Sequence, residues 1–182
     1  MASIITATTT SGLTQSADNS GVLQLASGTG NLVTVPSVTG TAMVSGNMPA
    51  FSAYQSSVQT LPTNINTKII FQTKEYDTAN AFDATTNYRF TPQVAGYYQV
   101  SGGFSIGATA CGIRLQIVKN GASYKTTFNA LSTTVNAAFG SALVYLNGST
   151  DYVELFGFIG VGQVLVTGIE VTYFQASLVR AG

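Results

Sequence analysis

The stretch FTPQVAGYYQV, residues 90–100, places a proline, a glycine and two adjacent tyrosines between apolar ends. Pro92 has no backbone N–H, so it suits a connection after a strand better than the interior of a sheet. Gly96 permits a bend or a close approach of chains where the next strand begins. Because successive side chains of a strand point to opposite faces, Tyr97 and Tyr98 do not act together. The stretch predicts a connection followed by a strand in which Tyr97 and Tyr98 face opposite sides.

The chain after residue 47 is patterned as β-structure throughout. Apolar and polar residues alternate in IRLQIVK, residues 113–119, and the Asn-Gly pair in residues 119–122 is a strong hairpin signal. No helical periodicity of useful length occurs, and many short strands at regular spacing predict an all-β sandwich or jelly roll. The expected strands are Ala50–Gln55, Lys68–Phe71, Tyr88–Phe90, Gly96–Ile106, Gly112–Lys119, Ala122–Leu131, Val135–Leu146, Asp151–Gly157, Val164–Thr167 and Glu170–Val179.

Residues 1–47 differ in composition from the rest. They contain no aromatic residue, and Asp18 is their only charged side chain. The pieces VLQL (residues 22–25) and LVTV (residues 32–35) have period-two patterns and are separated by Ser-Gly and Thr-Gly dipeptides, which predicts short strands joined by tight turns. A disordered tail is the alternative. We favour an ordered arm that packs on sister chains or on a larger particle, because it has too little apolar bulk to fold alone.

Charge is scarce in this sequence. Only 8% of the 182 residues are charged and the formal net charge is zero. The basic surface that binds nucleic acid is therefore not expected, and no Lys/Arg run suggests an anionic membrane surface. The most apolar run, residues 156–166, is too short to cross a bilayer, and MASIITATTT lacks the basic residues of a secretory signal. A nearly uncharged surface favours a protein that works in an assembly.

The sequence offers little catalytic chemistry. It has no histidine, which excludes Ser-His-Asp and Cys-His catalysis within the chain, and Cys111 is expected to be a small core residue. Asp77 and Asp83 are the candidate metal ligands, since carboxylates with backbone carbonyls bind calcium. Their spacing matches no EF-hand, and Lys74 and Arg89 are alternative partners for Asp77. We expect no catalytic residue and no cofactor, with calcium as the alternative that these carboxylates leave open.

Several tyrosines fall in or beside expected loops. A tyrosine ring supplies contact area at low entropy cost, so such residues suit binding to sugars or proteins. Packing in the core or against another subunit is the alternative for each of them. The candidates for surface recognition are Tyr54, Tyr76 and Tyr124.

Three motifs follow one another in residues 48–182: AFSA (residues 50–53), VKNG (118–121) and VTYFQASLV (171–179). In their order and spacing, residues 48–182 resemble the C1q-like globular domain of the C1q/TNF superfamily. Val100 and Gly102 depart from the pattern, because family members usually have aromatic residues there, and the spacing from Phe82 to Phe90 is one residue longer. The residues that carry the order and spacing of the family pattern are Phe51, Phe71, Asp77, Phe82, Phe90, Gly96, Tyr98 and Phe174.

This resemblance implies a ten-stranded jelly-roll head that assembles as a tight trimer around an apolar axis. The resemblance also implies that Tyr98 is an inner residue. The residues expected to specify the fold and the trimer are Phe51, Phe71, Phe82, Phe90, Gly96, Tyr98 and Phe174. The predicted organisation is an N-terminal β-rich arm, residues 1–47, that anchors the protein or intertwines the trimer, followed by the head, residues 48–182.

The arm is similar to Ser/Thr/Gly-rich β segments at the N-termini of bacteriophage virion proteins. Together with the head, this predicts a non-enzymatic trimeric virion surface protein, located on the exterior of the capsid or tail. Capsid decoration, as a cement or head-fibre-like protein, is favoured, and a short tail fibre or receptor-binding tip is the alternative. A free C1q-like lectin or ligand-binding module is the second alternative. The expected partners are two sister chains, other virion proteins through residues 1–47 and a host-surface glycan or protein, without nucleic acid or membrane insertion.

Overall fold

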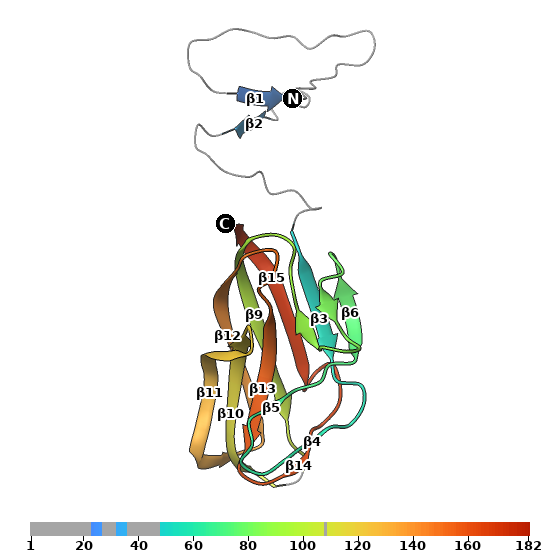
Figure 1. The fold of residues 1–182 in the computed structure, drawn as a ribbon, viewed down its shortest axis with the longest axis vertical. Coiled ribbons are helices and arrows are strands. Elements are labelled where there is room, and N and C mark those ends of the chain that lie inside the picture. Colours follow the sequence, from blue (N-terminus) through green and yellow to red (C-terminus); the bar gives the residue numbers. More distant parts are fainter. Residues whose placement is uncertain (1–22, 27–31, 36–47, 108) are drawn as a thin grey trace. The chain divides into compact units, whose positions relative to one another are not determined.

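The computed structural model of the protein describes residues 23–26, 32–35, 48–107 and 109–182. The chain divides into two units, residues 1–41 and 42–182, and each is described by itself. In the first unit, β1 (Leu23–Ala26) and β2 (Leu32–Val35) form an antiparallel pair (Figure 1). The two strands expected in VLQL and LVTV are therefore present, and the other residues of the predicted arm lie outside the described residues.

The second unit is a sandwich of two antiparallel sheets. The first sheet has the strand order β12 (Ala137–Leu146), β9 (Gly96–Ser105), β15 (Tyr173–Ala181), β3 (Ala50–Tyr54) and β6 (Thr73–Asp77). The second sheet has the order β11 (Ala122–Val135), β10 (Cys111–Lys119), β13 (Val153–Ile159), β8 (Arg89–Phe90) and β7 (Phe82–Asp83), and β5 (Thr67–Lys68) also pairs with β13. A separate short pair joins β4 (Thr60–Leu61) to β14 (Gln163–Val164).

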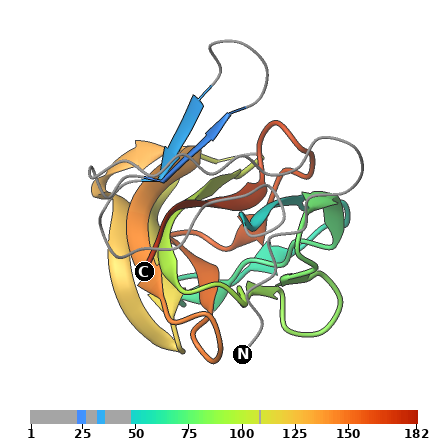
Figure 2. The same cartoon turned by 90° about the horizontal axis from the view of Figure 1, so that it is seen from above.

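The chain passes repeatedly from one sheet to the other, as from β9 to β10 and from β11 to β12, which gives a jelly roll. Every element in the described part of the chain is a strand, so the predicted all-β class is confirmed. Seen from above, β10 to β12 (yellow to orange) lie on one side of the sandwich, and β3 and β6 (teal to green) lie on the other (Figure 2).

Three strands of this unit were not expected from the sequence. The longest of them, β6, reads Thr-Lys-Glu-Tyr-Asp and shows no apolar alternation because it is an edge strand with a largely exposed burial pattern. The other two, β4 and β7, are two residues long. The ten expected strands are all represented, so the head is a jelly roll with short additional edge strands.

Several strand boundaries also differ from the expectation. The strand expected at Lys68–Phe71 ends at Lys68, although Ile69 and Phe71 are fully buried. The last strand begins at Tyr173 instead of Glu170, because Gly168 (φ 130) starts a turn in which the Thr172 N–H donates to the Gly168 carbonyl. The turn after Gly168 accounts for the second of these shifts.

Phenylalanine rings fill the space between the two sheets. The ring of Phe51 lies at centroid distances of 4.6 Å from both Phe82 and Phe90 and 5.0 Å from Phe174. Phe71 completes the group, 5.5 Å from Phe174, and all five rings are buried. The phenylalanines expected to specify the fold thus form one connected cluster in the core, and Cys111 is also buried, as expected.

The stretch from Phe90 to Val100 has the predicted arrangement. Tyr98 is fully buried, its hydroxyl donates to the Val94 carbonyl at 2.7 Å, and burial raises its pKa to about 12. Tyr97, on the opposite face, is exposed. A Cβ on Gly96 would lie 2.3 Å from the Arg180 carbonyl oxygen, so glycine at this position permits the close approach of β9 and β15.

The departure at Gly102 has a steric reason. A Cβ there would lie 2.4 Å from the carbonyl oxygen of Tyr173 and 2.6 Å from a methyl group of Leu155. The opposite strand and the second sheet already occupy the space that a larger side chain would need. The close packing of this core therefore explains the glycine at position 102.

Candidate assembly interface and recognition surfaces

The outer face of the first sheet carries exposed apolar side chains along β12, β9 and β15. Leu143 is 50% exposed in the middle of β12, between Phe139 and Tyr145 on the same face. Ring contacts continue this surface to the neighbouring strands, with Tyr145 5.3 Å from Tyr97 and Phe139 6.0 Å from Tyr173. We call this surface, made by Tyr97, Phe139, Leu143, Tyr145, Tyr173 and Val179, the apolar sheet face.

The sequence contained a signal for this surface. β12 reads AAFGSALVYL, which is largely apolar on both of its faces, whereas a strand with one face in water alternates. Its inward residues Ala138, Val144 and Leu146 are buried in the core. The outward residues Phe139, Leu143 and Tyr145 stay 41–50% exposed, as expected for a strand that another subunit covers.

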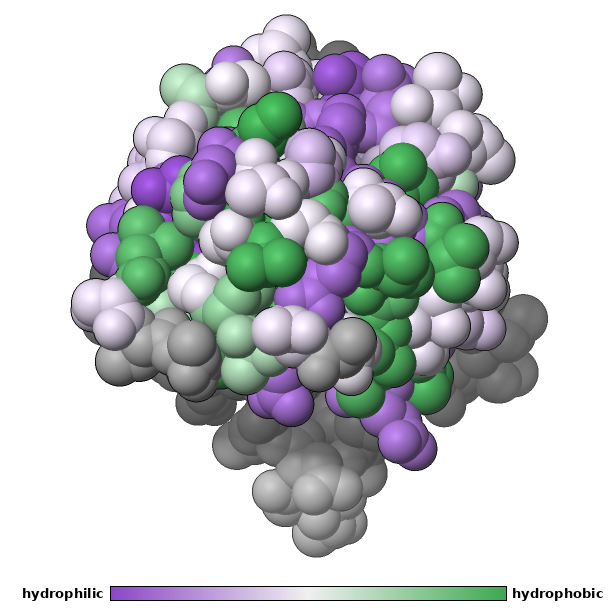
Figure 3. All heavy atoms as spheres, turned by 90° about the horizontal axis from the view of Figure 1, so that it is seen from below, coloured by the Kyte–Doolittle hydropathy of each residue, from purple (hydrophilic) through white to green (hydrophobic). Residues whose placement is uncertain are grey.

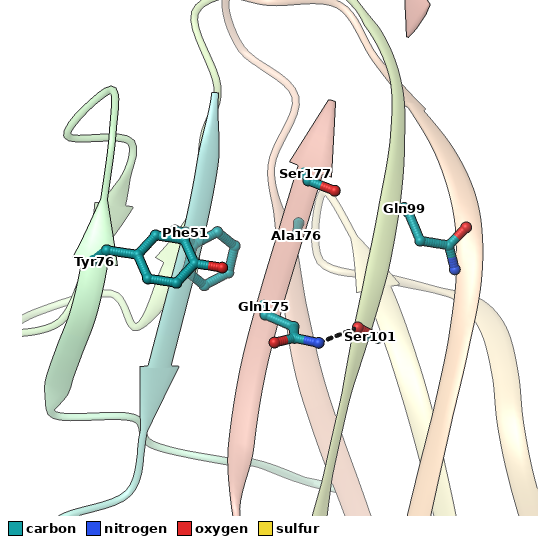
Figure 4. Close-up of a pocket in the computed structure, with 7 residues that line it drawn as sticks. All are labelled: Phe51, Tyr76, Gln99, Ser101, Gln175, Ala176 and Ser177. Carbon is teal, nitrogen blue, oxygen red and sulfur yellow. Dashed lines mark hydrogen bonds between the residues drawn. The ribbon is translucent and has the colours of Figure 1, made fainter. Parts of the chain in front are cut away.

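The same sheet face becomes polar toward β3 and β6. A cavity of about 170 Å³ is lined there by Tyr76, Gln99, Gln175 and Ser177, among others, and Gln175 donates to the Ser101 hydroxyl at 3.1 Å (Figure 4). Its volume lies below the roughly 300–1,000 Å³ of typical small-molecule sites. The cavity is therefore better regarded as a hollow in an interaction surface than as a ligand site.

The three tyrosines proposed for recognition do not form one site. Tyr54 on β3 is half-buried, and Tyr76 on the neighbouring β6 is exposed. Tyr124 is also exposed, but it lies on β11 in the second sheet, 5.6 Å from the Lys125 ammonium. Their role in recognition stays a prediction, and any contact would involve Tyr124 separately from the other two.

A polar groove of about 550 Å³ lies among the loops around β6, β7 and β8. These strands form the edge of the sandwich opposite to β11 and β12. The sequence indicated Arg89 only as a partner for Asp77, and it did not predict a groove here. The residues that line it are Lys74, Asn80, Ala81, Phe82, Asp83, Ala84, Thr85, Asn87, Arg89, Thr91, Gln93 and Ser149.

Asp77 closes the turn that leads from β6 to β7. Its carboxylate accepts the backbone N–H groups of Ala81 (2.9 Å) and Phe82 (3.0 Å), and Lys74 pairs with it at 3.0 Å. Burial raises the pKa of this carboxyl, but the two N–H groups and the Lys74 ammonium together outweigh it, so the pKa lies below its ordinary value. The predicted pairing with Lys74 is present, and Arg89 lies over Tyr152 instead.

Asp83 plays the same part in the next turn. Its two oxygens accept the backbone N–H groups of Thr86, Thr85 and Asn87, the Thr85 hydroxyl and the Asn87 amide. These bonds, first that from Thr86, hold the pKa of Asp83 well below its usual range.

Both candidate metal ligands, Asp77 and Asp83, thus stabilise the turns that follow them in the chain. The described part of the chain contains no cluster of three or more His, Cys, Asp or Glu residues suited to a metal ion. Calcium at Asp77 or Asp83 would compete with the backbone N–H groups that already occupy the carboxylate oxygens.

The end of the sandwich that carries β4 and β14 is apolar and lacks charge. Segments 56–66 and 159–169 contain no charged residue. Figure 3, which looks at this end, shows apolar side chains (green) beside hydrophilic ones (purple). The exposed apolar residues here are Val58, Ile65, Val161, Val164, Val166 and Ile169. No helix in the described part of the chain has the length and apolar character needed to cross a membrane.

Comparison with known proteins identifies solved structures with a similar architecture. No protein-family model matches the chain, and no curated protein does so. Among solved structures, the globular domain of the zebrafish complement 1qA protein is similar, with a TM-score of 0.53 and 22% identity over 74% of this chain and 99% of that domain. Murine APRIL at pH 8.0 matches with a TM-score of 0.57 and 8% identity over 72% of this chain and 99% of its own.

Eiger TNF from S. frugiperda gives a TM-score of 0.54 and 10% identity over 74% of this chain and 93% of its own. At such identities the likeness concerns the fold and not the activity. The head predicted from the order of Phe51, Phe82, Gly96 and Tyr98 is confirmed in its architecture. The chain folds as an all-β jelly roll of the C1q and TNF type.

Proposed function

We propose that the chain is a non-enzymatic, homotrimeric surface protein of a bacteriophage virion. In this proposal the jelly-roll head projects from the particle, and residues 1–47 attach it to other virion proteins or intertwine the three chains. The observation that carries the assembly is the apolar sheet face, where Leu143 and three aromatic rings stand exposed on a folded head. Exposed apolar patches of this kind mark interaction sites in soluble proteins.

The fold supports three as the number of chains. The C1q/TNF resemblance implies a trimer around an apolar axis, and a closed three-fold arrangement would cover the apolar sheet face of every chain. The scarcity of charge in the whole sequence agrees with this, because a protein with little charge repulsion depends on buried contacts to stay soluble.

The absence of histidine from the sequence and the turn-forming roles of Asp77 and Asp83 support a structural or binding role over catalysis. Asp77 and Asp83, the two candidate carboxylates, do not present an acid and base pair to a ligand. The role proposed for the loops and grooves of the head is therefore recognition.

The virion assignment is supported by the composition of residues 1–47, which are rich in Ser, Thr and Gly, contain no aromatic residue and resemble segments of virion proteins. Capsid decoration is the favoured location, because a trimeric head fits three-fold positions of a shell and because tail fibres need a long shaft. The short tail fibre and the free lectin-like module are the competing forms of this proposal.

Two measurements test the proposal. Light scattering of the purified full chain should give three times the mass of the 18.9 kDa chain, and a stable single chain would refute the trimer. Electron microscopy of intact particles labelled with antibody to the head should show many copies over the shell. A few copies at the tail would favour the fibre, and particles without the protein would favour the free module.

A further inference from the structure

Arg89 is the unpaired cation of the polar groove. Its guanidinium carbon lies 4.2 Å from the centroid of the Tyr152 ring, and within the described residues no carboxylate lies at ion-pair distance from it. The nearest candidate by strand register is Asp83, opposite Arg89 across β7 and β8, but the oxygens of Asp83 accept five hydrogen bonds from its own turn. The other cation of the groove, Lys74, is already paired with Asp77.

This arrangement prepares Arg89 to bind an anion. Stacking on Tyr152 holds the planar guanidinium in one orientation while its N–H groups stay available at the edge. A guanidinium fork of this kind matches the two oxygens of a carboxylate. Because the side chain is already ordered, binding costs less conformational entropy than it would for a mobile arginine.

The rest of the groove suits a ligand rich in hydroxyl groups. Its walls carry amide and hydroxyl side chains, and those of Gln93 and Thr91 make no hydrogen bond within the part of the chain that the structure describes. The volume of about 550 Å³ falls within the range of ligand sites. The turns fixed by Asp77 and Asp83 keep these walls in place.

The charge of the groove selects a single anionic group. Lys74 and Asp77 form a neutral pair, and the charges of Arg89 and Asp83 balance, so the groove has no excess positive charge. A polyanion would meet the Asp83 charge after its first contact with Arg89. One carboxylate on an otherwise neutral, hydroxylated chain fits this balance better.

We propose that this groove binds a carboxylate-bearing sugar unit of a surface glycan, with Arg89 holding the carboxylate and Gln93 contacting the sugar hydroxyls. The inference deepens the recognition role in the proposed function. It does not depend on trimer assembly or on the place of the protein in a particle, since every lining residue comes from one chain.

The experiment is titration calorimetry of the full chain with oligosaccharides that end in sialic, glucuronic or galacturonic acid, each beside its neutral parent. We expect binding of at least one acidic member, with the neutral parent about tenfold or more weaker, because a charge-assisted hydrogen-bonded pair is lost. Arg89→Gln should weaken binding by a similar factor. Arg89→Lys should also weaken it, because the charge remains but the fork is lost.

Arg114→Gln is the matched control. Arg114 is also stacked on a ring, 4.9 Å from the centroid of Phe158, and its loss changes the net charge equally, but it does not line the groove. This variant should bind as the unchanged protein does, with folding of all variants checked by thermal unfolding. No binding by any acidic sugar, equal binding of the neutral parents, or unchanged binding by Arg89→Gln would each overturn the proposal.

Inorganic phosphate and acetate are titrated as separate arms. If either binds as tightly as the best acidic sugar, the groove is a general anion site and the saccharide assignment is wrong. Light scattering on the same samples reports the oligomeric state, so a failed trimer and a failed sugar site are distinguished in one set of proteins.

Discussion

Replacing Leu143 by arginine should break the proposed trimer without unfolding the chain. Leu143 lies at the centre of the apolar sheet face, and half of its side chain is exposed in the single chain. An exposed substitution usually changes stability by less than about 0.5 kcal/mol. The long arginine side chain can extend into water from a separate chain, so the folded head should tolerate Leu143→Arg.

In a trimer that buries this face, the same change is costly. Full burial of a leucine contributes about 1.5–3 kcal/mol, so the exposed half of Leu143 would contribute about 1 kcal/mol per chain on assembly. A buried, unpaired guanidinium adds a penalty of several kcal/mol per chain. Summed over three chains, the loss exceeds about 10 kcal/mol, which corresponds to about seven powers of ten in the assembly constant.

Light scattering at matched protein concentration measures this effect. The unchanged chain should have three times the mass of the 18.9 kDa chain, and Leu143→Arg should have the mass of one chain with an unchanged circular dichroism spectrum. The control is Ile65→Arg, a similar change at a side chain that is 56% exposed at the uncharged end of the sandwich, and it should stay trimeric. A trimer that survives Leu143→Arg would refute the assignment of the apolar sheet face as the assembly interface.

Three further predictions concern the stability of the head. Phe51→Ala should lower the free energy of unfolding by about 3–5 kcal/mol in denaturant titrations, because it empties the centre of the phenylalanine cluster. Gly96→Ala should cost about 1–3 kcal/mol in the same assay, since its Cβ would meet the carbonyl oxygen of Arg180, whereas the control Gly107→Ala meets no atom closer than 3.8 Å and should be neutral. Because the folded pKa of Asp83 is depressed, its stabilising contribution is present above the unfolded pKa of about 3.9 and is lost as the pH falls below it. The thermal midpoint of Asp83→Asn should accordingly be lower at pH 7 and should fall less steeply with acid than that of the unchanged protein, and parallel curves would contradict this role.

The fold could be predicted because its signals are local and repeat along the chain. Alternation in β10 and the Asn-Gly turn before β11 define strands whatever surrounds them. The opposite orientation of Tyr97 and Tyr98 followed from their period-two positions, whereas the burial of Tyr98 was implied by the family resemblance. The strand β6 could not be predicted in this way. It is an exposed edge strand, so its pairing with β3 is decided by backbone hydrogen bonds and leaves no apolar pattern.

The candidate sites were less accessible to sequence reasoning. Asp77 and Asp83 had the composition of metal ligands, and only the direction of the following N–H groups showed that they close turns. Arg89 and Tyr152 are far apart in the sequence, and nothing in either segment predicts that they stack. Charge and residue type indicated the candidates, whereas the contacts that decide their roles are long-range.

The sequence by itself determined that this protein is an all-β jelly roll in which Tyr97 and Tyr98 face opposite sides of one strand, because strand periodicity and turn chemistry act over a few residues. Only the tertiary structure decided which outward residues gather into the apolar sheet face and which polar ones enclose a groove with one unpaired arginine. Those groupings depend on the order of strands in the two sheets, which neighbouring residues in the chain do not encode.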